Sequence, residues 1–209
     1  MKAQKLIILD FDGTIIASEG IWKRIYKMYC QNNKFRYLKW IDALFGNIAF
    51  DDWISQIKNA HQTSIEYDKF LHEVYNIAIS CYCEKEPVLG FKQFADKHIS
   101  DCMIVVSKEE PFLIDAYLKH YGIKNAVTIL QDANDLRHNC FFYKNIANRN
   151  GFSIEKTIFI DDSLSHCCSA KESGVYVVGI NDSHSSERQK QMMSVCDIYV
   201  ENFKEILGV

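Results

Sequence analysis

Short apolar runs alternate with helical patterns over most of the chain, and this alternation predicts the core. Apolar runs bounded by polar residues predict strands, the last of them at an edge, at 5–10, 102–106, 127–130, 157–160, 175–178 and 198–200. Helical spacing, or helix-end residues, predict helices at 91–97, between Pro111 and Gly122, at 140–150 and at 164–173. The pattern indicates an α/β fold with a parallel sheet and helices on both faces.

Residues 15–85 follow a different pattern, which predicts helices and no clear strand. Apolar residues recur at helical spacing in three stretches: after Ser18, at 52–57, and after Ser64. Ser18 and Ser64 are residue types that cap helix N-termini. The buried stripe of the third helix is expected to begin at Ile65.

The composition fits a core with one inserted subdomain. The chain has 209 residues, of which 48% are hydrophobic, so a sizeable core is feasible. We expect the core to comprise 1–14 and 86–209 and the helical subdomain to comprise 15–85. The sequence gives no indication of the oligomeric state.

Charge and hydropathy exclude several classes of partner. The formal net charge of −3 gives no reason to expect nucleic acid or an anionic membrane as a partner. No apolar run approaches the ~20 residues that span a bilayer. The run Leu6–Leu9 is too short for a signal peptide, so we expect a soluble, cytoplasmic protein.

Eight cysteines raise the question of zinc or disulfides. Cys81 and Cys83 are separated by one residue, and Cys167 and Cys168 are adjacent. Neither spacing is that of a zinc knuckle, which has two residues between its cysteines. We therefore expect reduced thiols, as is usual in a cytoplasmic enzyme.

Two acids follow the first predicted strand. Asp10 and Asp12 are two residues apart, so both can project the same way from the strand end, and Gly13 permits a tight turn after them. A pair of carboxylates is costly unless a cation neutralises it. A metal ion and a phosphate-sized space would explain the arrangement. A surface turn is the alternative, since Asp and Gly are common turn residues.

Two other predicted strands also end in polar residues. Ser107 follows the strand at 102–106, and Asp161 and Asp162 follow the strand at 157–160. The carboxyl ends of parallel strands share one edge of the sheet, where α/β proteins bind ligands. Acids at a helix N-terminus would explain one aspartate. That explanation does not account for two adjacent acids after an apolar strand.

Five segments in this order resemble the motifs of the haloacid dehalogenase (HAD) superfamily. They are DFDGTIIASE at 10–19, the P-x-x-G turn at 87–90, VVSK at 105–108, IDDS at 160–163 and SAKESGVYVVGI at 169–180. The chain is similar to the phosphoglycolate phosphatase and β-phosphoglucomutase group. The resemblance implies a Rossmann-like parallel sheet core flanked by helices, with an inserted α-helical cap.

The resemblance implies roles for the acids. Asp10 would attack phosphorus and form an aspartyl-phosphate, and Asp12 would act as the general acid and base. Asp162 would bind Mg²⁺ with Asp161 nearby as a second acid, and the carboxylate of Asp10 and the backbone carbonyl of Asp12 would complete the metal site.

Neutral and basic residues would hold the phosphate. The hydroxyl of Ser107 can donate to a phosphate oxygen, and backbone N–H groups around Gly13 and after Ser107, including that of Lys108, can hold the others. Ser107 is therefore expected to be both a substrate-binding and a catalytic residue.

The chain departs from the family pattern at two positions. The third motif is usually a lysine, and its register falls on Arg137, which also carries a positive charge. Lys144 and Lys108 are the alternatives for this role. His166 stands where relatives often carry an aspartate, and it could bond to the site or face solvent.

The resemblance implies a Mg²⁺-dependent phosphatase acting on a small phosphorylated metabolite. Asp12 favours phosphoryl transfer over dehalogenation, because a halide leaves without needing a proton. A phosphomutase acting on a sugar phosphate is one alternative. A non-catalytic binding protein is another, supported by the departures at Arg137 and His166.

Overall fold

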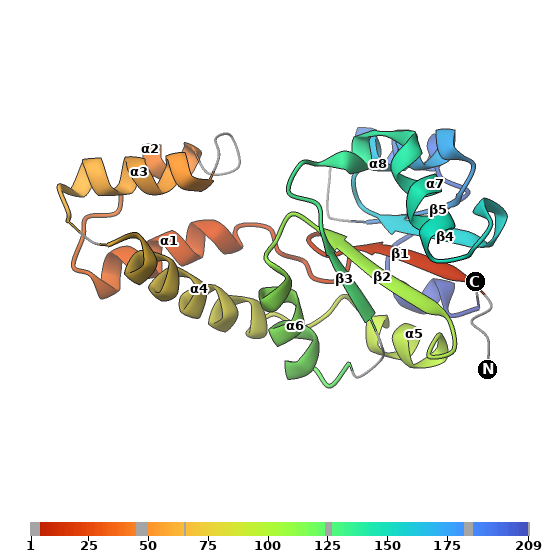
Figure 1. Cartoon of the computed structure of the whole chain (residues 1–209), viewed down its shortest axis with the longest axis horizontal. Coiled ribbons are helices and arrows are strands. Elements are labelled where there is room, and N and C mark those ends of the chain that lie inside the picture. Colours follow the sequence, from red (N-terminus) through yellow and green to blue (C-terminus); the bar gives the residue numbers. More distant parts are fainter. Residues whose placement is uncertain (1–4, 45–49, 65, 124–126, 182–185, 209) are drawn as a thin grey trace. The chain divides into compact units, whose positions relative to one another are not determined.

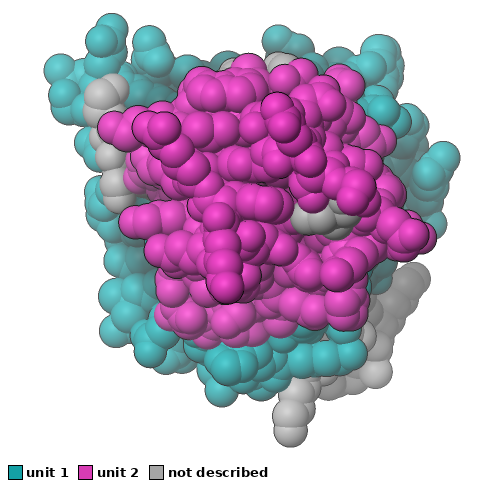
Figure 2. Space-filling model, turned by 90° about the vertical axis from the view of Figure 1, so that its left-hand side faces the viewer, with its two compact units in different colours: residues 1–17, 85–209 teal, residues 18–84 magenta. Residues whose placement is uncertain are grey.

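The computed structural model describes residues 5–44, 50–64, 66–123, 127–181 and 186–208. The chain divides into two compact units, which Figure 2 shows in different colours. We call Met1–Ala17 with Lys85–Val209 the core unit, and Ser18–Glu84 the helical unit. The chain thus leaves the core unit after Ala17 and returns to it at Lys85.

The core unit contains a six-stranded sheet in the order β3-β2-β1-β4-β5-β6, with every pair of neighbours parallel (Figure 1). The strands are β1 (Leu6–Asp10), β2 (Cys102–Ser107), β3 (Val127–Gln131), β4 (Thr157–Asp161), β5 (Tyr176–Ile180) and β6 (Ile198–Val200). Each of the six predicted strands is therefore present, with β6 at an edge as expected. The predicted α/β class is confirmed.

Helices cover both faces of this sheet. The α-helices of the core unit are α5 (Phe91–Lys97), α6 (Pro111–His120), α7 (Cys140–Arg149), α8 (Leu164–Ser173) and α9 (Ser186–Val195). Three short 3-10 helices complete it: η1 (Leu136–His138), η2 (Ile154–Lys156) and η3 (Phe203–Ile206). Figure 1 shows α7 and α8 on one side of the sheet and α5 and α6 on the other. All five residues of β1 are buried, as expected for a central strand covered on both faces.

The face under α7 and α8 holds a continuous apolar core. Leu6 and Ile8 of β1 belong to it together with Tyr143 of α7 and Cys167 of α8. Alternate residues of a strand point to opposite faces, so Asp10, which follows Ile8 by two, leaves the strand on this same side. The packing of the core therefore directs the first acid toward α7 and α8.

The helical unit consists of α1 (Ile21–Asn32), α2 (Lys39–Leu44), α3 (Phe50–His61) and α4 (Tyr67–Cys83). Helices α1 and α4 lie side by side, and their Tyr29 and Phe70 rings meet edge to face with centroids 4.9 Å apart. All three predicted helices are present, and α2 is additional. With six residues, α2 is too short to show a helical period in the sequence.

Two predicted caps are wrong. Gly20, at φ 73°, is the N-cap of α1, and Glu66 is the N-cap of α4, so neither Ser18 nor Ser64 has that role. A glycine takes this left-handed conformation without the strain that a side chain would add. Ile65 lies outside the described residues.

The structure bears on two further expectations. All eight cysteines are free thiols, in agreement with the sequence prediction. Among the described helices, none has both the length and the apolar character needed to cross a bilayer.

Candidate active site

Three polar side chains meet at the carboxyl edge of the sheet. Asp10, Ser107 and Asp161 are the last residues of β1, β2 and β4. Because β1 lies between β2 and β4 and pairs in parallel with both, the three strand ends are adjacent. The sheet therefore brings together residues that are about 100 and 150 positions apart in sequence.

Three carboxylates form a compact acidic group at this edge. Asp10, Asp161 and Asp162 each offer an oxygen, and these oxygens all lie within 4.8 Å of one another. Asp10 is only 5% exposed, and Asp161 is fully buried. Burial raises the pKa of Asp10 well above its usual range, and Asp161 raises it further, although Arg137 opposes both. Three carboxylates this close together, two of them buried, suit a hard divalent cation.

Arg137 is the cation nearest this acidic group. It lies in η1 and is only 3% exposed. Its Nη1 donates to Asp10 Oδ1 and to the Val106 carbonyl at 3.2 Å, and lies 3.7 Å from Asp161 Oδ2. Burial disfavours its charge, but Asp10 and Asp161 outweigh burial and raise its pKa. Arg137 therefore remains charged and fixed against Asp10.

Asp132 holds the other side of this guanidinium, and the sequence analysis did not identify it. It is 3% exposed and accepts hydrogen bonds from Arg137 Nε at 3.1 Å and from the backbone N–H groups of Leu136 and Arg137 at 2.7 and 3.3 Å. It directly follows β3, so it too is an acid at a strand end. Its position directly after a predicted strand is the feature of the sequence that could have identified it.

Thr14 and Gly13 fix the position of Asp162. The Thr14 hydroxyl accepts from the Asp162 backbone N–H at 3.1 Å and donates to Asp162 Oδ1 at 3.3 Å. Gly13 has φ 85°, and a Cβ there would lie 2.4 Å from Asp162 Oδ2. Both the backbone conformation and the close approach therefore require glycine.

The remaining predicted residues lie at different depths. Ser107 is buried, and its Oγ accepts from the Glu109 N–H at 3.0 Å, which leaves the hydroxyl hydrogen to donate elsewhere. Asp12 is half-buried and pairs through its backbone with Ile16. Lys108 is largely exposed, with Nζ 2.7 Å from Asp135 Oδ2.

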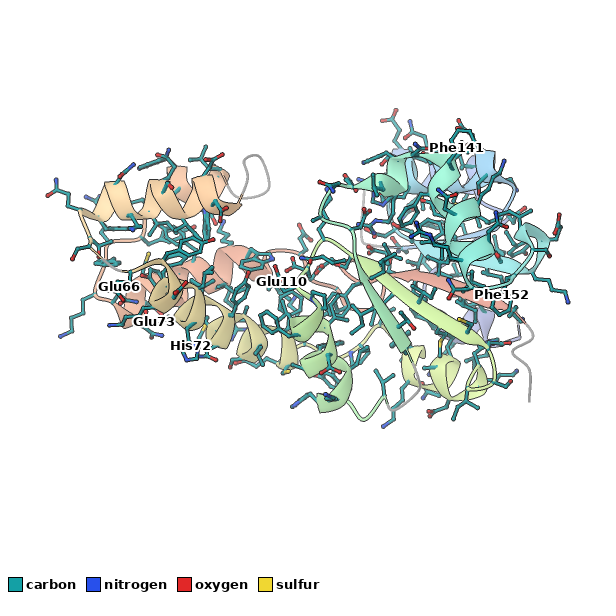
Figure 3. The ribbon with its side chains drawn as sticks, viewed as in Figure 1. Glu66, His72, Glu73, Glu110, Phe141 and Phe152 are labelled. Carbon is teal, nitrogen blue, oxygen red and sulfur yellow. The ribbon has the colours of Figure 1, made fainter. Side chains whose placement is uncertain are left out.

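The structure distinguishes the three candidates for the third-motif cation. Lys144 is exposed on α7, with Nζ 5.9 Å from the ring centroid of Phe141, which is labelled in Figure 3. Lys108 pairs with Asp135. Of these three residues, the structure brings Arg137 to Asp10.

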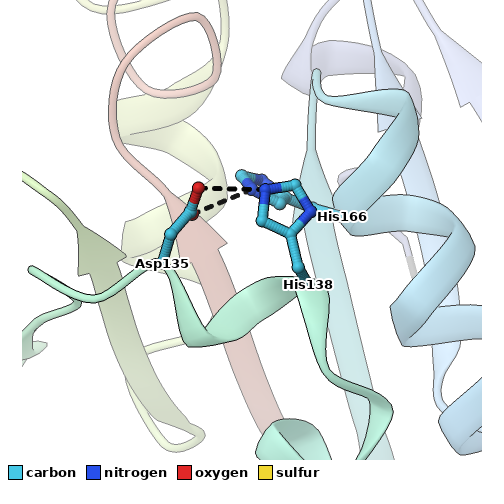
Figure 4. A group of neighbouring side chains, drawn as sticks. All are labelled: Asp135, His138 and His166. Carbon is cyan, nitrogen blue, oxygen red and sulfur yellow. Dashed lines mark hydrogen bonds and ion pairs between the residues drawn. The ribbon is translucent and has the colours of Figure 1, made fainter. Parts of the chain in front are cut away.

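His166 bonds toward the acidic group. It is 9% exposed, its Nδ1 lies 3.0 Å from Asp161 Oδ2, and its Nε2 lies 3.3 Å from Asp135 Oδ1. His138 also reaches Asp135, with Nε2 2.9 Å from Oδ2 (Figure 4). Of the two possibilities left open for His166, the structure shows the contact with the site.

Comparison with known proteins places the chain in a family. A family model described as haloacid dehalogenase-like hydrolase matches residues 7–180. No curated protein matches the chain.

Solved structures share the fold at low sequence identity. A "putative beta-phosphoglucomutase" from Thermotoga maritima is 16% identical with a TM-score of 0.74, covering 97% of this chain and 96% of its own. The "putative HAD-hydrolase YfnB" from Bacillus subtilis, bound to magnesium, is 14% identical with a TM-score of 0.68 over 100% of both chains. A "predicted phosphoglycolate phosphatase" from Haemophilus somnus is 19% identical, with a TM-score of 0.63 over 99% of this chain and 98% of its own. The chain belongs to the haloacid dehalogenase-like hydrolase family.

Proposed function

We propose that the protein is a Mg²⁺-dependent phosphatase that hydrolyses a small phosphorylated metabolite through an aspartyl-phosphate on Asp10. The observation that carries the proposal is the position of Asp10, buried at a strand end between Arg137 and the acids Asp161 and Asp162. Membership of a hydrolase family supports it. So does the fold shared with a predicted phosphoglycolate phosphatase.

Asp10, Asp161 and Asp162 would hold the cation, with the backbone carbonyl of Asp12. Their oxygens are hard ligands, and a cation there would offset both the burial of Asp10 and its proximity to Asp161, which raise its pKa. When bound, Mg²⁺ screens the repulsion between Asp10 and an anionic phosphate and stabilises charge on the transferring oxygens. The magnesium in the related Bacillus structure supports this assignment.

The chain's own residues would carry two displacement steps. An Asp10 carboxylate oxygen attacks phosphorus, the bond to the leaving oxygen breaks, and Asp12 gives that oxygen a proton. Asp12 then takes a proton from water as the water oxygen attacks the same phosphorus. The bond between Asp10 and phosphorus breaks, and inorganic phosphate leaves.

Arg137 would orient Asp10 and balance its charge. A lysine ammonium is a point charge on a flexible stem, whereas the guanidinium here contacts Asp10, Val106 and Asp132 at once. The hydroxyl of Ser107 and the backbone N–H groups around Gly13 and Lys108 would hold phosphate oxygens.

The helical unit would serve as the cap, with the predicted insertion at 15–85. Its two connections to the core unit, at Ala17 and Lys85, fit such an insertion. A cap that closes during turnover excludes water and limits substrates to small ones. The related Bacillus structure is described as revealing interdomain movement, which supports a moving cap. The cytoplasmic location stays a prediction.

Phosphate release from a panel of small phosphate esters, with and without Mg²⁺, tests the proposal. Asp10→Asn is the control variant, because it keeps the shape of the side chain and removes the nucleophile. Release that needs both Mg²⁺ and Asp10 is the expected result. Equal release by Asp10→Asn would contradict the nucleophile assignment.

Product analysis separates hydrolysis from transfer. The same reactions are run with sugar phosphates, and the positions of the phosphate groups are followed by ³¹P NMR. A phosphatase yields inorganic phosphate. Movement of phosphate to a second hydroxyl would instead identify a phosphomutase.

A further inference from the structure

Next to the acidic group lies a second set of metal-binding residue types, which we call the outer triad: Asp135, His138 and His166. Each offers one ligand atom, and these atoms all lie within 4.8 Å of one another. Figure 4 shows both imidazole rings turned toward the Asp135 carboxylate. The outer triad offers two nitrogens and one oxygen as ligands, whereas the acidic group of Asp10, Asp161 and Asp162 offers only carboxylate oxygens.

The hydrogen bond between His166 and Asp161 indicates which ring nitrogen of His166 carries a hydrogen. Its Nδ1 lies 3.0 Å from Asp161 Oδ2, and an ionised carboxylate can only accept a hydrogen bond. Nδ1 therefore carries the hydrogen, and in the neutral ring Nε2 presents a lone pair. A carboxylate bonded to the far nitrogen of a histidine is the usual outer-shell support of a metal-bound imidazole.

His166 Nε2 lies near an oxygen that has no hydrogen bond. Asp135 Oδ1 is buried and accepts none from the described part of the chain, although His166 Nε2 lies 3.3 Å away. A metal ion bound by both atoms would compensate the buried carboxylate oxygen. Buried unsatisfied oxygens of this kind call for a water or an ion.

The ligand positions fit a small divalent ion. At metal–ligand distances of about 2.0–2.2 Å, ligand atoms in a tetrahedral site lie roughly 3.3 Å apart. His138 Nε2 donates a hydrogen bond to Asp135 Oδ2 at 2.9 Å, and His166 Nε2 lies 3.3 Å from Asp135 Oδ1. An ion that binds His138 Nε2 would shift that hydrogen to Nδ1. Small adjustments would place all three ligands around one ion.

The segment that carries these ligands is held in place. Asp135 has φ 53° and precedes η1, which contains His138. The buried hydroxyl of Tyr143 lies 2.9 Å from the Arg137 carbonyl and 3.2 Å from the His166 carbonyl. One side chain of α7 thus joins both parts of the outer triad.

We propose that the outer triad binds a zinc-class divalent ion, such as Zn²⁺ or Co²⁺, in addition to the Mg²⁺ of the proposed active site. Imidazole nitrogens favour these ions over Mg²⁺, which prefers oxygen ligands. The two neighbouring sites would therefore select different metals. Lys108 competes for the second site, because its ammonium lies 2.7 Å from Asp135 Oδ2.

The test is a titration of the protein without a polyhistidine tag. Co²⁺ is added at pH 7.5 in excess Mg²⁺, and the visible absorption of bound Co²⁺ is recorded. The Asp10→Asn variant is used throughout, so that turnover plays no part in the result, and the excess Mg²⁺ competes with Co²⁺ for Asp161 and Asp162. We expect one Co²⁺ per chain, displaced by Zn²⁺.

Variants identify the ligands. The His138 side chain is 51% exposed, so His138→Ala should fold normally and bind Co²⁺ at least about tenfold more weakly. His72→Ala is the matched control, because His72 is an exposed histidine on α4 (Figure 3). Lys108→Ala should tighten binding by removing the competing ammonium.

Two results would overturn the proposal. One is the absence of bound Co²⁺ in excess Mg²⁺. The other is equal Co²⁺ binding by His138→Ala and His72→Ala. Since neither measurement involves a phosphate ester, failure here leaves the proposed phosphatase activity untouched.

Discussion

Two groups of charged residues lie side by side at the sheet edge and differ in how their charges are compensated. Asp10, Asp132, Arg137 and Asp161 form the inner group, and each is at most 5% exposed. Lys108, Asp135 and His138 lie outside it with more exposed side chains. A buried charge depends on its protein partners, whereas water can replace a lost partner at the surface. Substitutions should therefore act strongly in the inner group and weakly outside it.

The largest effect is expected for Asp10→Asn. The amide cannot form the aspartyl-phosphate, so turnover should fall by about 10⁴-fold or more. Steady-state phosphate release with Mg²⁺ measures it. Circular dichroism should show an unchanged fold. If the variant lost its fold, its activity could not be compared with that of variants of the outer residues.

Arg137→Ala should come next. It leaves Asp10, Asp132 and Asp161 without their shared cation, and breaking such a buried pair costs about 3–5 kcal/mol of stability. We expect kcat to fall by about 10²- to 10³-fold as well. Chemical denaturation and kinetics measure the two losses.

Arg137→Lys sharpens this test. Lysine restores the charge near Asp10 but has no Nε to bond Asp132, so both losses should be intermediate. Wild-type activity in Arg137→Ala, with a loss in Lys144→Ala, would move the third-motif role to Lys144.

Asp132→Asn should have a smaller effect, about tenfold in kcat, since Asp132 acts through Arg137. The amide oxygen can still accept from Leu136, but the charge that holds Arg137 Nε is gone. A double-mutant cycle with Arg137→Lys measures the coupling. The two substitutions should be less than additive, because lysine has already lost the Nε bond. Full additivity would show that Asp132 acts independently of Arg137.

The raised pKa of Asp10 predicts a pH effect on metal-free stability. An acid with a raised pKa in the folded state favours folding when protonated, and this contribution is lost as pH rises through the raised pKa. Without Mg²⁺, Asp10→Asn should therefore melt at a higher temperature than the wild type at pH 7. The difference should shrink as the pH falls toward the ordinary pKa of aspartate. Thermal melts in EDTA at several pH values measure it, and a constant difference would contradict the assignment to Asp10.

The smallest effect is expected for Lys144→Ala. Lys144 is exposed on α7 and stacks over Phe141, away from Asp10. Activity should change by less than about twofold, and stability by less than about 0.5 kcal/mol. A large loss of activity in Lys144→Ala would contradict the expectation that exposed cations matter less than buried ones.

The sequence predicted the strands well because the sheet is covered on both faces, which leaves continuous apolar runs such as Leu6–Leu9. Asp10, Ser107 and Asp161 were found because they end such runs. Asp132 follows β3, whose alternate exposure at the sheet edge makes its end less distinct. The cap of α1 depends on the positive φ of Gly20, which the hydrophobic pattern does not report.

The outer triad was beyond sequence reasoning for a different reason. His166 attracted notice as a departure from the family pattern, but nothing linked it to Asp135. Their contact depends on the left-handed backbone at Asp135 and on the packing of Tyr143 between η1 and α8. Both are consequences of tertiary structure.

The pairing of β1 on both sides also sets the order of events during synthesis. Leu6 pairs with Cys102 on one side and with Thr157 on the other, so β1 waits for a partner made about 150 residues later. At a ribosomal rate of about 5–20 residues per second, that interval is roughly 8–30 s. The helical unit, Ser18–Glu84, lies within the loop that must close before β1 meets β2. Asp10 is therefore made long before Asp161 and Asp162, and the acidic group can form only after β4 has been synthesised.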